Sequence, residues 1–487
     1  MTDTLAPVRP GRLIINGEAV DAASGRTFTT VNPATEAPIC DVAEAGAEDV
    51  DRAVRAARAA FDSGPWPRMK PAERQRLLWK LSELIESHAD EIARLETLDN
   101  GKPLFESRQV DIPMVVNTFQ YFAGWATKLA GETLPVNPAY FTYTLRQPLG
   151  VVGAIIPWNF PMIMTGWKTA PALAAGNTVV LKPAELTPLS AIRIGELAIE
   201  AGIPPGVFNV VPGKGSIAGE AMVKHPGVDK ISFTGSTEVG RHIMKTAADT
   251  MKKLTLELGG KSPNIVFADA DLEAAVRGAT AGIFYGKGEV CAAGSRLLVE
   301  RSIHEAFVAK LAERAKKMSP ADPLDPKTRL GALVSQEQMA KVLEYVEIGK
   351  KEGARVVAGG ERQPVNGKGF FVQATVLDQV ENTMRVAQEE IFGPVLAVIP
   401  FDGVDDAIQK ANGVDFGLAA GVWTQNVKTA HAVARRLQAG TVWINTYNFY
   451  DAGMPFGGYK QSGFGRDLGP ECLRDVTQVK SVWVSVE

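Results

Sequence analysis

The fold is decided by an apolar run and the turn that follows it: Val151-Val152-Gly153-Ala154-Ile155-Ile156-Pro157-Trp158-Asn159-Phe160-Pro161. From this point on, short apolar runs alternate with segments of helix length. The apolar runs cover residues 151–156, 178–182, 207–211, 230–233 and 254–258, and the helical segments include 189–201 and 238–248. This alternation predicts βαβ units, which build a mostly parallel sheet with helices on both faces.

A second alternating region follows residue 291. We expect strands near 297–300, 355–358, 395–400, 421–424 and 441–445, and helices near 304–317, 337–351 and 429–437. The N-terminal part predicts a hairpin around Asn16-Gly17-Glu18, followed by two amphipathic helices. The sequence therefore predicts an α/β protein with two doubly wound α/β domains.

Composition narrows the class of protein. With 487 residues, the chain is too long for one ordinary core, and its net charge of −3 without a basic stripe argues against a nucleic-acid partner. The three cysteines are widely spaced, so they give no disulfide framework and favour a cytoplasmic location. The five histidines show no metal-ligand spacing, so no metal is expected. The uncharged stretch 147–167 contains three prolines, which predicts a buried strand and turn and no membrane partner. We expect no signal peptide at residues 1–13.

Three short motifs hold the candidate chemistry. Cys291 lies among small residues, Glu257 ends an apolar run before Gly259-Gly260, and Asn159 follows the first predicted strand. A thiol, a carboxylate base and an amide that holds an oxyanion suit acyl chemistry through a thioester. Each residue also has an ordinary interpretation: a buried structural cysteine, a solvated glutamate at a strand end and an asparagine in a turn.

In their order and separation, these motifs resemble the NAD(P)-dependent aldehyde dehydrogenase family from about Gly17 to Val484. The resemblance implies an oxidoreductase that converts an aldehyde to a carboxylic acid while NAD is reduced. Cys291 forms a thiohemiacetal and then a thioester, Asn159 stabilises the oxyanion, and Glu257 activates water. Glu257 indicates the hydrolytic, non-CoA-acylating type, because relatives that transfer the acyl group to coenzyme A generally lack this glutamate. Lys168 is expected to relay protons, and a structural role for it is equally open.

The resemblance also implies a domain organisation. Residues 1–129 and 150–258 are expected to form a Rossmann-like NAD-binding domain, and residues 259–455 a catalytic domain. Residues 130–149 and 476–487 are expected to form a small β oligomerisation arm that pairs with a neighbouring subunit in a homodimer or homotetramer. The tail alternates as a half-exposed strand does, although an ordinary edge strand within its own domain would alternate in the same way.

The cofactor prediction rests on scattered positions. Gly235 and Ser236 join a predicted strand to a helix N-terminus, which suits a pyrophosphate and equally suits a tight turn. Glu185 can bind ribose hydroxyls and would repel a 2′-phosphate, so NAD is favoured over NADP. By resemblance, the cofactor-binding residues are Ile156, Trp158, Lys182, Glu185, Gly215, Phe233, Gly235, Ser236, Gly240, Leu258, Glu390 and Phe392.

The aldehyde is expected in a tunnel with aromatic walls. By resemblance, its lining residues are Phe160, Met164, Trp167, Tyr285, Val290, Tyr450 and Phe456. Such walls favour apolar, aliphatic or aromatic aldehydes, and betaine-type aldehydes are an alternative through cation–π attraction. Several of these side chains are open to a simpler interpretation as core aromatics.

Positions 286 and 287 are Gly and Lys where many relatives have Asn and Gln, and position 289 is Glu where many have Gln. We expect Glu289 to alter the pKa of the nearby thiol.

Two other classes of function remain open from the sequence. The first is an NAD-independent thiol esterase or acyltransferase, against which Glu185 and Glu390 argue, because ester hydrolysis needs no dinucleotide. The second is a non-catalytic binding protein on the same scaffold. The presence of Cys291, Glu257 and Asn159 argues against it.

Overall fold

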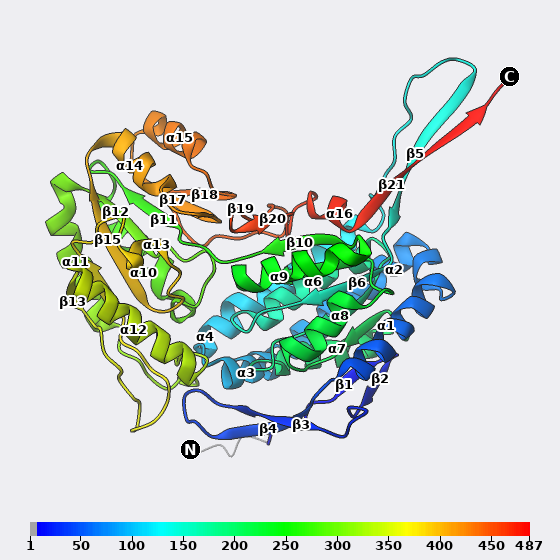
Figure 1. Ribbon diagram of the computed structural model, residues 1–487, viewed down its shortest axis with the longest axis horizontal. Coiled ribbons are helices and arrows are strands. Elements are labelled where there is room, and N and C mark those ends of the chain that lie inside the picture. Colours follow the sequence, from blue (N-terminus) through cyan, green and yellow to red (C-terminus); the bar gives the residue numbers. More distant parts are fainter. Residues whose placement is uncertain (1–6) are drawn as a thin grey trace.

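The computed structural model describes residues 7–487, and two large sheets dominate it (Figure 1). The first sheet has eight strands in the order β2-β1-β8-β7-β6-β9-β10-β20. These strands are β1 (Leu13–Ile15), β2 (Glu18–Val20), β6 (Val151–Ile155), β7 (Thr178–Lys182), β8 (Phe208–Val210), β9 (Lys230–Thr234), β10 (Lys253–Glu257) and β20 (Gly463–Phe464). The strands from β8 to β10 run parallel, and antiparallel strands close both edges.

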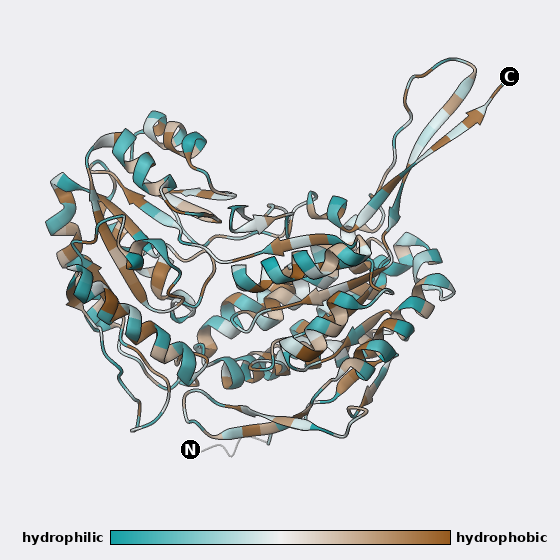
Figure 2. Ribbon diagram, viewed as in Figure 1, coloured by the Kyte–Doolittle hydropathy of each residue, from teal (hydrophilic) through white to brown (hydrophobic). Residues whose placement is uncertain are grey.

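Two layers of helices cover this sheet. In β6, β7 and β9 every residue is buried, as expected of parallel strands that are covered on both faces. The first layer contains α1 (Ala47–Asp62), α8 (Glu220–Lys224) and α9 (Thr237–Ala247), and the second contains α2 (Pro71–Ser87), α3 (Ala89–Asn100), α5 (Ile112–Trp125), α6 (Pro161–Ala174) and α7 (Leu189–Ala201). Figure 2 shows the strands as predominantly apolar ribbons beneath helices with hydrophilic outer faces.

The second sheet has seven strands in the order β13-β14-β15-β12-β11-β17-β18, and only the β13–β14 pair is antiparallel. Its strands are β11 (Pro263–Val266), β12 (Arg296–Glu300), β13 (Arg355–Ala358), β14 (Thr375–Asp378), β15 (Val395–Phe401), β17 (Ala419–Trp423) and β18 (Thr441–Ile444). Its helices are α10 (Leu272–Phe284), α11 (His304–Lys317), α12 (Gln336–Glu352), α14 (Gly403–Asn412) and α15 (Val427–Arg436). The predicted pair of doubly wound α/β domains is confirmed.

Short elements complete the chain. Strands β3 (Thr27–Val31) and β4 (Pro38–Ala43) form one small sheet, and β16 (Phe416–Gly417) and β19 (Tyr459–Lys460) form another. The short helices are α4 (Leu104–Glu106), α13 (Arg385–Gln388) and α16 (Cys472–Asp475). None of the helices in the described part of the chain is long and apolar enough to cross a membrane.

The strand order of the first sheet marks a ligand crevice. Numbered along the chain from β6, the parallel strands lie in the order 3-2-1-4-5, so the winding direction reverses between β6 and β9. In open α/β sheets, ligands bind at such a reversal, outside the carboxyl ends of the strands. The loops that begin at Ile156 and Gly235 follow these two strands and flank the crevice.

A two-stranded arm extends away from both domains (Figure 1). It pairs β5 (Tyr140–Pro148) with β21 (Thr477–Ser485) in antiparallel register, from Thr477 opposite Pro148 to Ser485 opposite Tyr140. In the single chain, β21 is exposed along almost its whole length, and 61% of Trp483 is accessible. The alternative of an edge strand inside its own domain is wrong, because β21 pairs with β5 alone.

Candidate active site

A sharply bent loop presents Cys291. It follows the 3₁₀ turn Tyr285–Gly288, in which three consecutive residues have positive φ angles: 57° at Gly286, 61° at Lys287 and 73° at Gly288. A Cβ atom on Gly288 would lie 2.2 Å from the carbonyl oxygen of Gly393, so this position accepts only glycine. The bend brings the Cys291 side chain into the wall of a cavity.

Glu257 ends β10 and lies next to the thiol. Burial raises the pKa of its carboxyl group to about 7, although the Lys168 ammonium opposes this shift. Within residues 7–487, neither carboxylate oxygen makes a well-formed hydrogen bond, which leaves lone pairs free for a water molecule. Burial, reinforced by the Glu257 charge, raises the pKa of the Cys291 thiol well above its usual range. The thiol is therefore protonated at neutral pH, with a carboxylate base beside it.

Asn159 follows β6 and is buried. Its side-chain Nδ2 donates a hydrogen bond of 2.8 Å to the carbonyl oxygen of Glu289, two residues before Cys291. An amide nitrogen carries two hydrogens, so one remains for a substrate oxygen. This contact links the candidate oxyanion donor directly to the loop that carries the nucleophile.

Lys168 lies on α6, and its Nζ is 2.6 Å from Oδ2 of Asp467, with both side chains buried. The Lys168 charge lowers the pKa of Glu257, and the Asp467 charge raises it. The sequence predictions missed Asp467, because 299 residues separate it from Lys168 and no local motif marks it. The Lys168–Asp467 ion pair therefore places one positive and one negative charge near Glu257, the candidate base.

The predicted cofactor residues of the first domain gather at the crevice. They follow or end parallel strands: Ile156 and Trp158 after β6, Lys182 and Glu185 after β7, Gly215 after β8, Phe233, Gly235 and Ser236 at β9, and Leu258 after β10. Gly240 lies on α9, where an added Cβ would be 2.6 Å from Leu258. Ser236 caps this helix by accepting a hydrogen bond from the Val239 N–H. These observations fit a dinucleotide whose pyrophosphate binds at a tightly packed strand–helix turn.

Two predicted cofactor residues, Glu390 and Phe392, belong to the second domain and contact residues that follow strands of the first sheet. Oε1 of Glu390 accepts a 2.8 Å hydrogen bond from the Gly260 N–H, and a Cβ on Gly259 would collide with the same carboxylate at 2.4 Å. Phe392 has a φ of 61°, and its ring lies edge-on to Trp158 with 5.2 Å between the ring centroids. The loop after α13 therefore closes over the carboxyl ends of the first sheet.

A cavity of about 380 Å³ leads to Cys291. All seven predicted tunnel residues line it, together with Val110, Met114, Ile163, Ala281, Asn448 and Phe449, which the sequence predictions missed. Trp167, Tyr450 and Phe456 form an aromatic cluster, with Phe456 centred 5.4 Å from Trp167 and 5.5 Å from Tyr450. None of the lining side chains is acidic or basic, so the cavity suits an apolar substrate.

The expected influence of Glu289 on the thiol is not what the structure shows. The Glu289 carboxylate does not line the cavity, and it lies 2.7 Å from the Nζ of Lys287. After burial, the main influences that raise the pKa of the Cys291 thiol are the carboxylates of Glu257 and Glu390.

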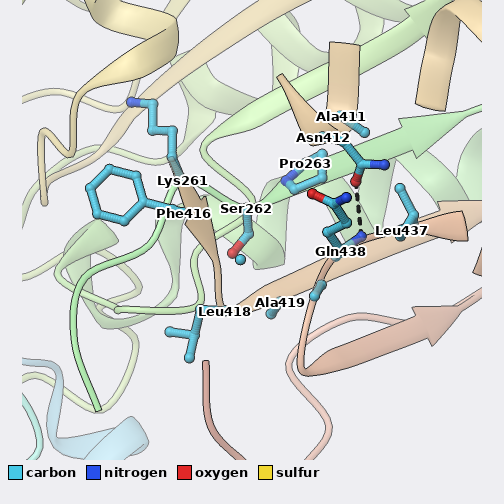
Figure 3. A pocket seen from close by; sticks show the side chains of 13 residues that line it. Lys261, Ser262, Pro263, Ala411, Asn412, Phe416, Leu418, Ala419, Leu437 and Gln438 are labelled. Carbon is cyan, nitrogen blue, oxygen red and sulfur yellow. Dashed lines mark hydrogen bonds between the residues drawn. The ribbon is translucent and has the colours of Figure 1, made fainter. Parts of the chain in front are cut away.

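Figure 3 shows a smaller cavity of about 10 Å³ beside Ser262 and Pro263, which has room for about one water molecule. The buried Lys261 side chain extends away from Asn412 and Gln438 in this view, and burial lowers its pKa to about 7. The cavity is too small for an aldehyde. Across residues 7–487, no group of three or more His, Cys, Asp or Glu side chains is arranged to hold a metal ion.

Fold and site together define a two-domain α/β enzyme in which a half-buried thiol, a carboxylate and an amide converge at the carboxyl ends of a doubly wound sheet. Residues 19–482 match the model of the "Aldehyde dehydrogenase family". The chain is 53% identical over 476 residues to "Putative aldehyde dehydrogenase DhaS" of Bacillus subtilis, covering 98% of this chain and 96% of that protein. It is 50% identical to human "Retinal dehydrogenase 2", with coverages of 98% and 92%.

Solved structures agree with these matches. An NAD+ complex of an aldehyde dehydrogenase from Bacillus cereus superimposes with a TM-score of 0.97 at 53% identity, covering 98% of this chain and 97% of that chain. A mutant of P. syringae AldA, an indole-3-acetaldehyde dehydrogenase in complex with NAD+ and IAA, has a TM-score of 0.96 at 49% identity and the same coverages. The chain belongs to the aldehyde dehydrogenase family. The predicted family and the predicted class of reaction, oxidation of an aldehyde, are thereby confirmed.

Proposed function

We propose that this protein oxidises an apolar aldehyde to the carboxylic acid through a Cys291 thioester, with NAD as the hydride acceptor. The observation that carries this proposal is the uncharged cavity of about 380 Å³ that ends at Cys291. The experiment that tests it is aldehyde-dependent formation of NADH by the purified protein.

The residues act in sequence. Glu257 accepts the thiol proton as the sulfur attacks the aldehyde carbon, and Asn159 and the Cys291 N–H hold the resulting oxyanion. When bound, NAD accepts the hydride from the carbon. After the thiol proton has passed from Glu257 to solvent, the ionised Glu257 removes a proton from the water that hydrolyses the thioester. It returns this proton to the departing Cys291 sulfur as the acid leaves. Lys168 and Asp467 hold a fixed pair of charges behind the base.

NAD is supported by two observations. Solved structures that this chain matches include NAD+ complexes of aldehyde dehydrogenases. Glu185, at the end of the crevice, adds a carboxylate where an adenosine ribose would lie, with Lys182 3.5 Å away. A 2′-phosphate would be repelled there, which favours NAD over NADP.

Replacing Glu185 by serine is expected to raise the ratio of NADP to NAD use, expressed as kcat/KM, by about tenfold. This corresponds to about 1.4 kcal/mol, a reasonable size for one partly solvated charge repulsion. Initial rates with each cofactor measure the ratio. Glu200→Ser, which removes an exposed carboxylate on α7, is the matched control. An unchanged ratio in Glu185→Ser would show that this carboxylate does not select the cofactor.

A series of straight-chain aldehydes tests the tunnel. We expect kcat/KM to rise by about three- to fourfold per added CH₂, because each buried methylene contributes about 0.8 kcal/mol, until the cavity is full. Betaine aldehyde and its neutral isostere 3,3-dimethylbutanal form a matched pair that differs only in charge. We expect the neutral compound to be preferred, because no acidic side chain lines the cavity. A preference for the cation would establish the betaine-type alternative, in which the aromatic rings attract the ammonium group.

We further propose that residues 1–129 and 150–258 bind NAD, that residues 259–455 form the catalytic domain, and that residues 130–149 and 476–487 form an oligomerisation arm. The arm exposes Phe141, Val479 and Trp483, and two strands alone are marginally stable in water. A second copy of the chain would bury them in a homodimer or homotetramer, whose mass sedimentation velocity measures. Three free cysteines support a cytoplasmic location, which fractionation of cells tests.

A further inference from the structure

A fully buried ion pair lies within the bend that leads to Cys291. Nζ of Lys287 is 2.7 Å from Oε2 of Glu289, and each residue is at most 2% exposed. The same Nζ donates to both the carbonyl oxygen and Oδ1 of Asn100, at 2.7 and 2.8 Å, and the other carboxylate oxygen of Glu289 accepts from the Val334 N–H at 3.1 Å. Buried charges that lie this deep are costly unless they are paired, and here the two opposite charges face each other.

The ion pair is one link in a closed ring of contacts. From Asn100, the side-chain Nδ2 donates to the carbonyl oxygens of Trp158 and Asn159, at 2.8 and 3.2 Å. The Asn159 amide in turn donates to the carbonyl oxygen of Glu289. The ring therefore runs from Lys287 through Asn100 and Asn159 to Glu289 and returns to Lys287. It fixes both the backbone and the side chain of Asn159.

The conformation of Lys287 supports a specific role for this ring. Its backbone has a φ of 61°, a left-handed conformation that is unfavourable for a residue with a long side chain. Strained residues persist where the surrounding structure holds them in place, and they cluster at functional sites. Here the anchors are the three contacts of the Lys287 ammonium group, and the strained bend leads directly to Cys291.

We propose that Lys287 and Glu289 are positioning residues that hold the Asn159 amide at the distance from Cys291 needed to bind the oxyanion. This inference rests on the proposed function, because it assumes that Asn159 stabilises the attack on the aldehyde. The pair acts through Asn159, and neither Lys287 nor Glu289 lines the substrate cavity. Removal of one partner leaves an unpaired charge that pulls the loop out of place.

The first experiment measures the single-turnover rate of NADH formation, normalised to the number of NAD-binding sites. Lys287→Met is expected to slow this rate by about tenfold to a hundredfold, less than the loss of a whole oxyanion donor, with an unchanged Kd for NAD. The double variant Lys287→Gln with Glu289→Gln removes both charges and keeps side chains that can hydrogen bond. It is expected to recover to within about threefold of the parent. Lys410→Met, which removes a lysine paired with Asp406 on α14, is the matched control and leaves the rate unchanged.

The decisive experiment repeats Lys287→Met in an Asn159→Ala background. A residue that acts through the Asn159 amide has no further effect once that amide is gone, so we expect less than about twofold additional slowing. A full multiplicative loss would overturn the proposal and indicate a general structural role. Failure of the proposed function has a different signature, because Asn159→Ala alone would then leave the single-turnover rate unchanged. If Asn159→Ala is slow and Lys287→Met is as fast as the parent, only the positioning role fails.

Discussion

Replacing Cys291 by alanine is expected to lower the rate of aldehyde-dependent NADH formation by more than about 10⁴-fold. The sulfur is the atom that bonds to the aldehyde carbon, and no other thiol lines the cavity. Without the covalent bond, no tetrahedral oxyanion forms for Asn159 to stabilise. Absorbance at the NADH wavelength follows the reaction, and fluorescence titration checks that NAD still binds.

Cys40→Ala is the matched control, because Cys40 is also a free cysteine but lies on β4, outside the cavity. It should keep the parent rate. Turnover by Cys291→Ala above about 1% of the parent rate would contradict the covalent mechanism. Loss of NAD binding in the same variant would instead indicate a disrupted fold.

The second large effect concerns Glu257. Glu257→Gln is expected to release about one equivalent of NADH per site, more slowly than the parent because the thiol must then lose its proton to solvent. It should then stall, with the steady-state rate reduced by about 10²- to 10⁴-fold. The amide cannot take a proton from water, so the thioester persists. Intact-mass spectrometry detects the acyl group on Cys291, and hydroxylamine, which attacks thioesters without a base, should restore turnover. An unchanged steady-state rate would exclude Glu257 as the base for hydrolysis.

The pH dependence follows from the raised pKa of Glu257. Only the ionised carboxylate acts as a base, so deacylation in the parent should be slow below pH 6, rise through about pH 7 and level off near pH 8. Glu257→Gln should lose this rise. Asp378→Asn is the control, because this buried carboxylate on β14 forms ion pairs with Arg355 and His304 and does not line the cavity. It should lower stability and leave the pH profile intact.

The central strands could be predicted because burial on both faces leaves an apolar run that sequence alone reveals. All five parallel strands of the first sheet match their predicted positions to within one residue at either end. β11 was missed because its four residues begin with proline and asparagine. β14 was missed because only two of its four residues, Val376 and Leu377, are apolar. Helix α14 was also missed. Its first residue, Gly403, has a φ of 74°, and a glycine is not a recognisable start of a helix.

The residues of the candidate site also fall into two groups: those that the sequence could reveal and those that it could not. Cys291, Glu257 and Asn159 lie in local motifs, and the structure brings them together. Asn100 and Asp467 carry no such signal, because their contacts depend on partners 187 and 299 residues away. The charges at Lys287 and Glu289 were visible as departures from the family pattern. Their pairing was not, since two buried charges two residues apart face each other only when the chain bends as it does here.

The position of β20 has a consequence for synthesis. This strand pairs with β10 and closes the edge of the first sheet, although it comes after the whole second domain in the chain. Asp467, which pairs with Lys168, follows it directly. During translation at about 5 to 20 residues per second, the first domain must wait for the second to emerge before its edge and its buried lysine are satisfied. The nascent chain therefore exposes an open sheet edge for tens of seconds, an interval in which chaperones would find a binding site.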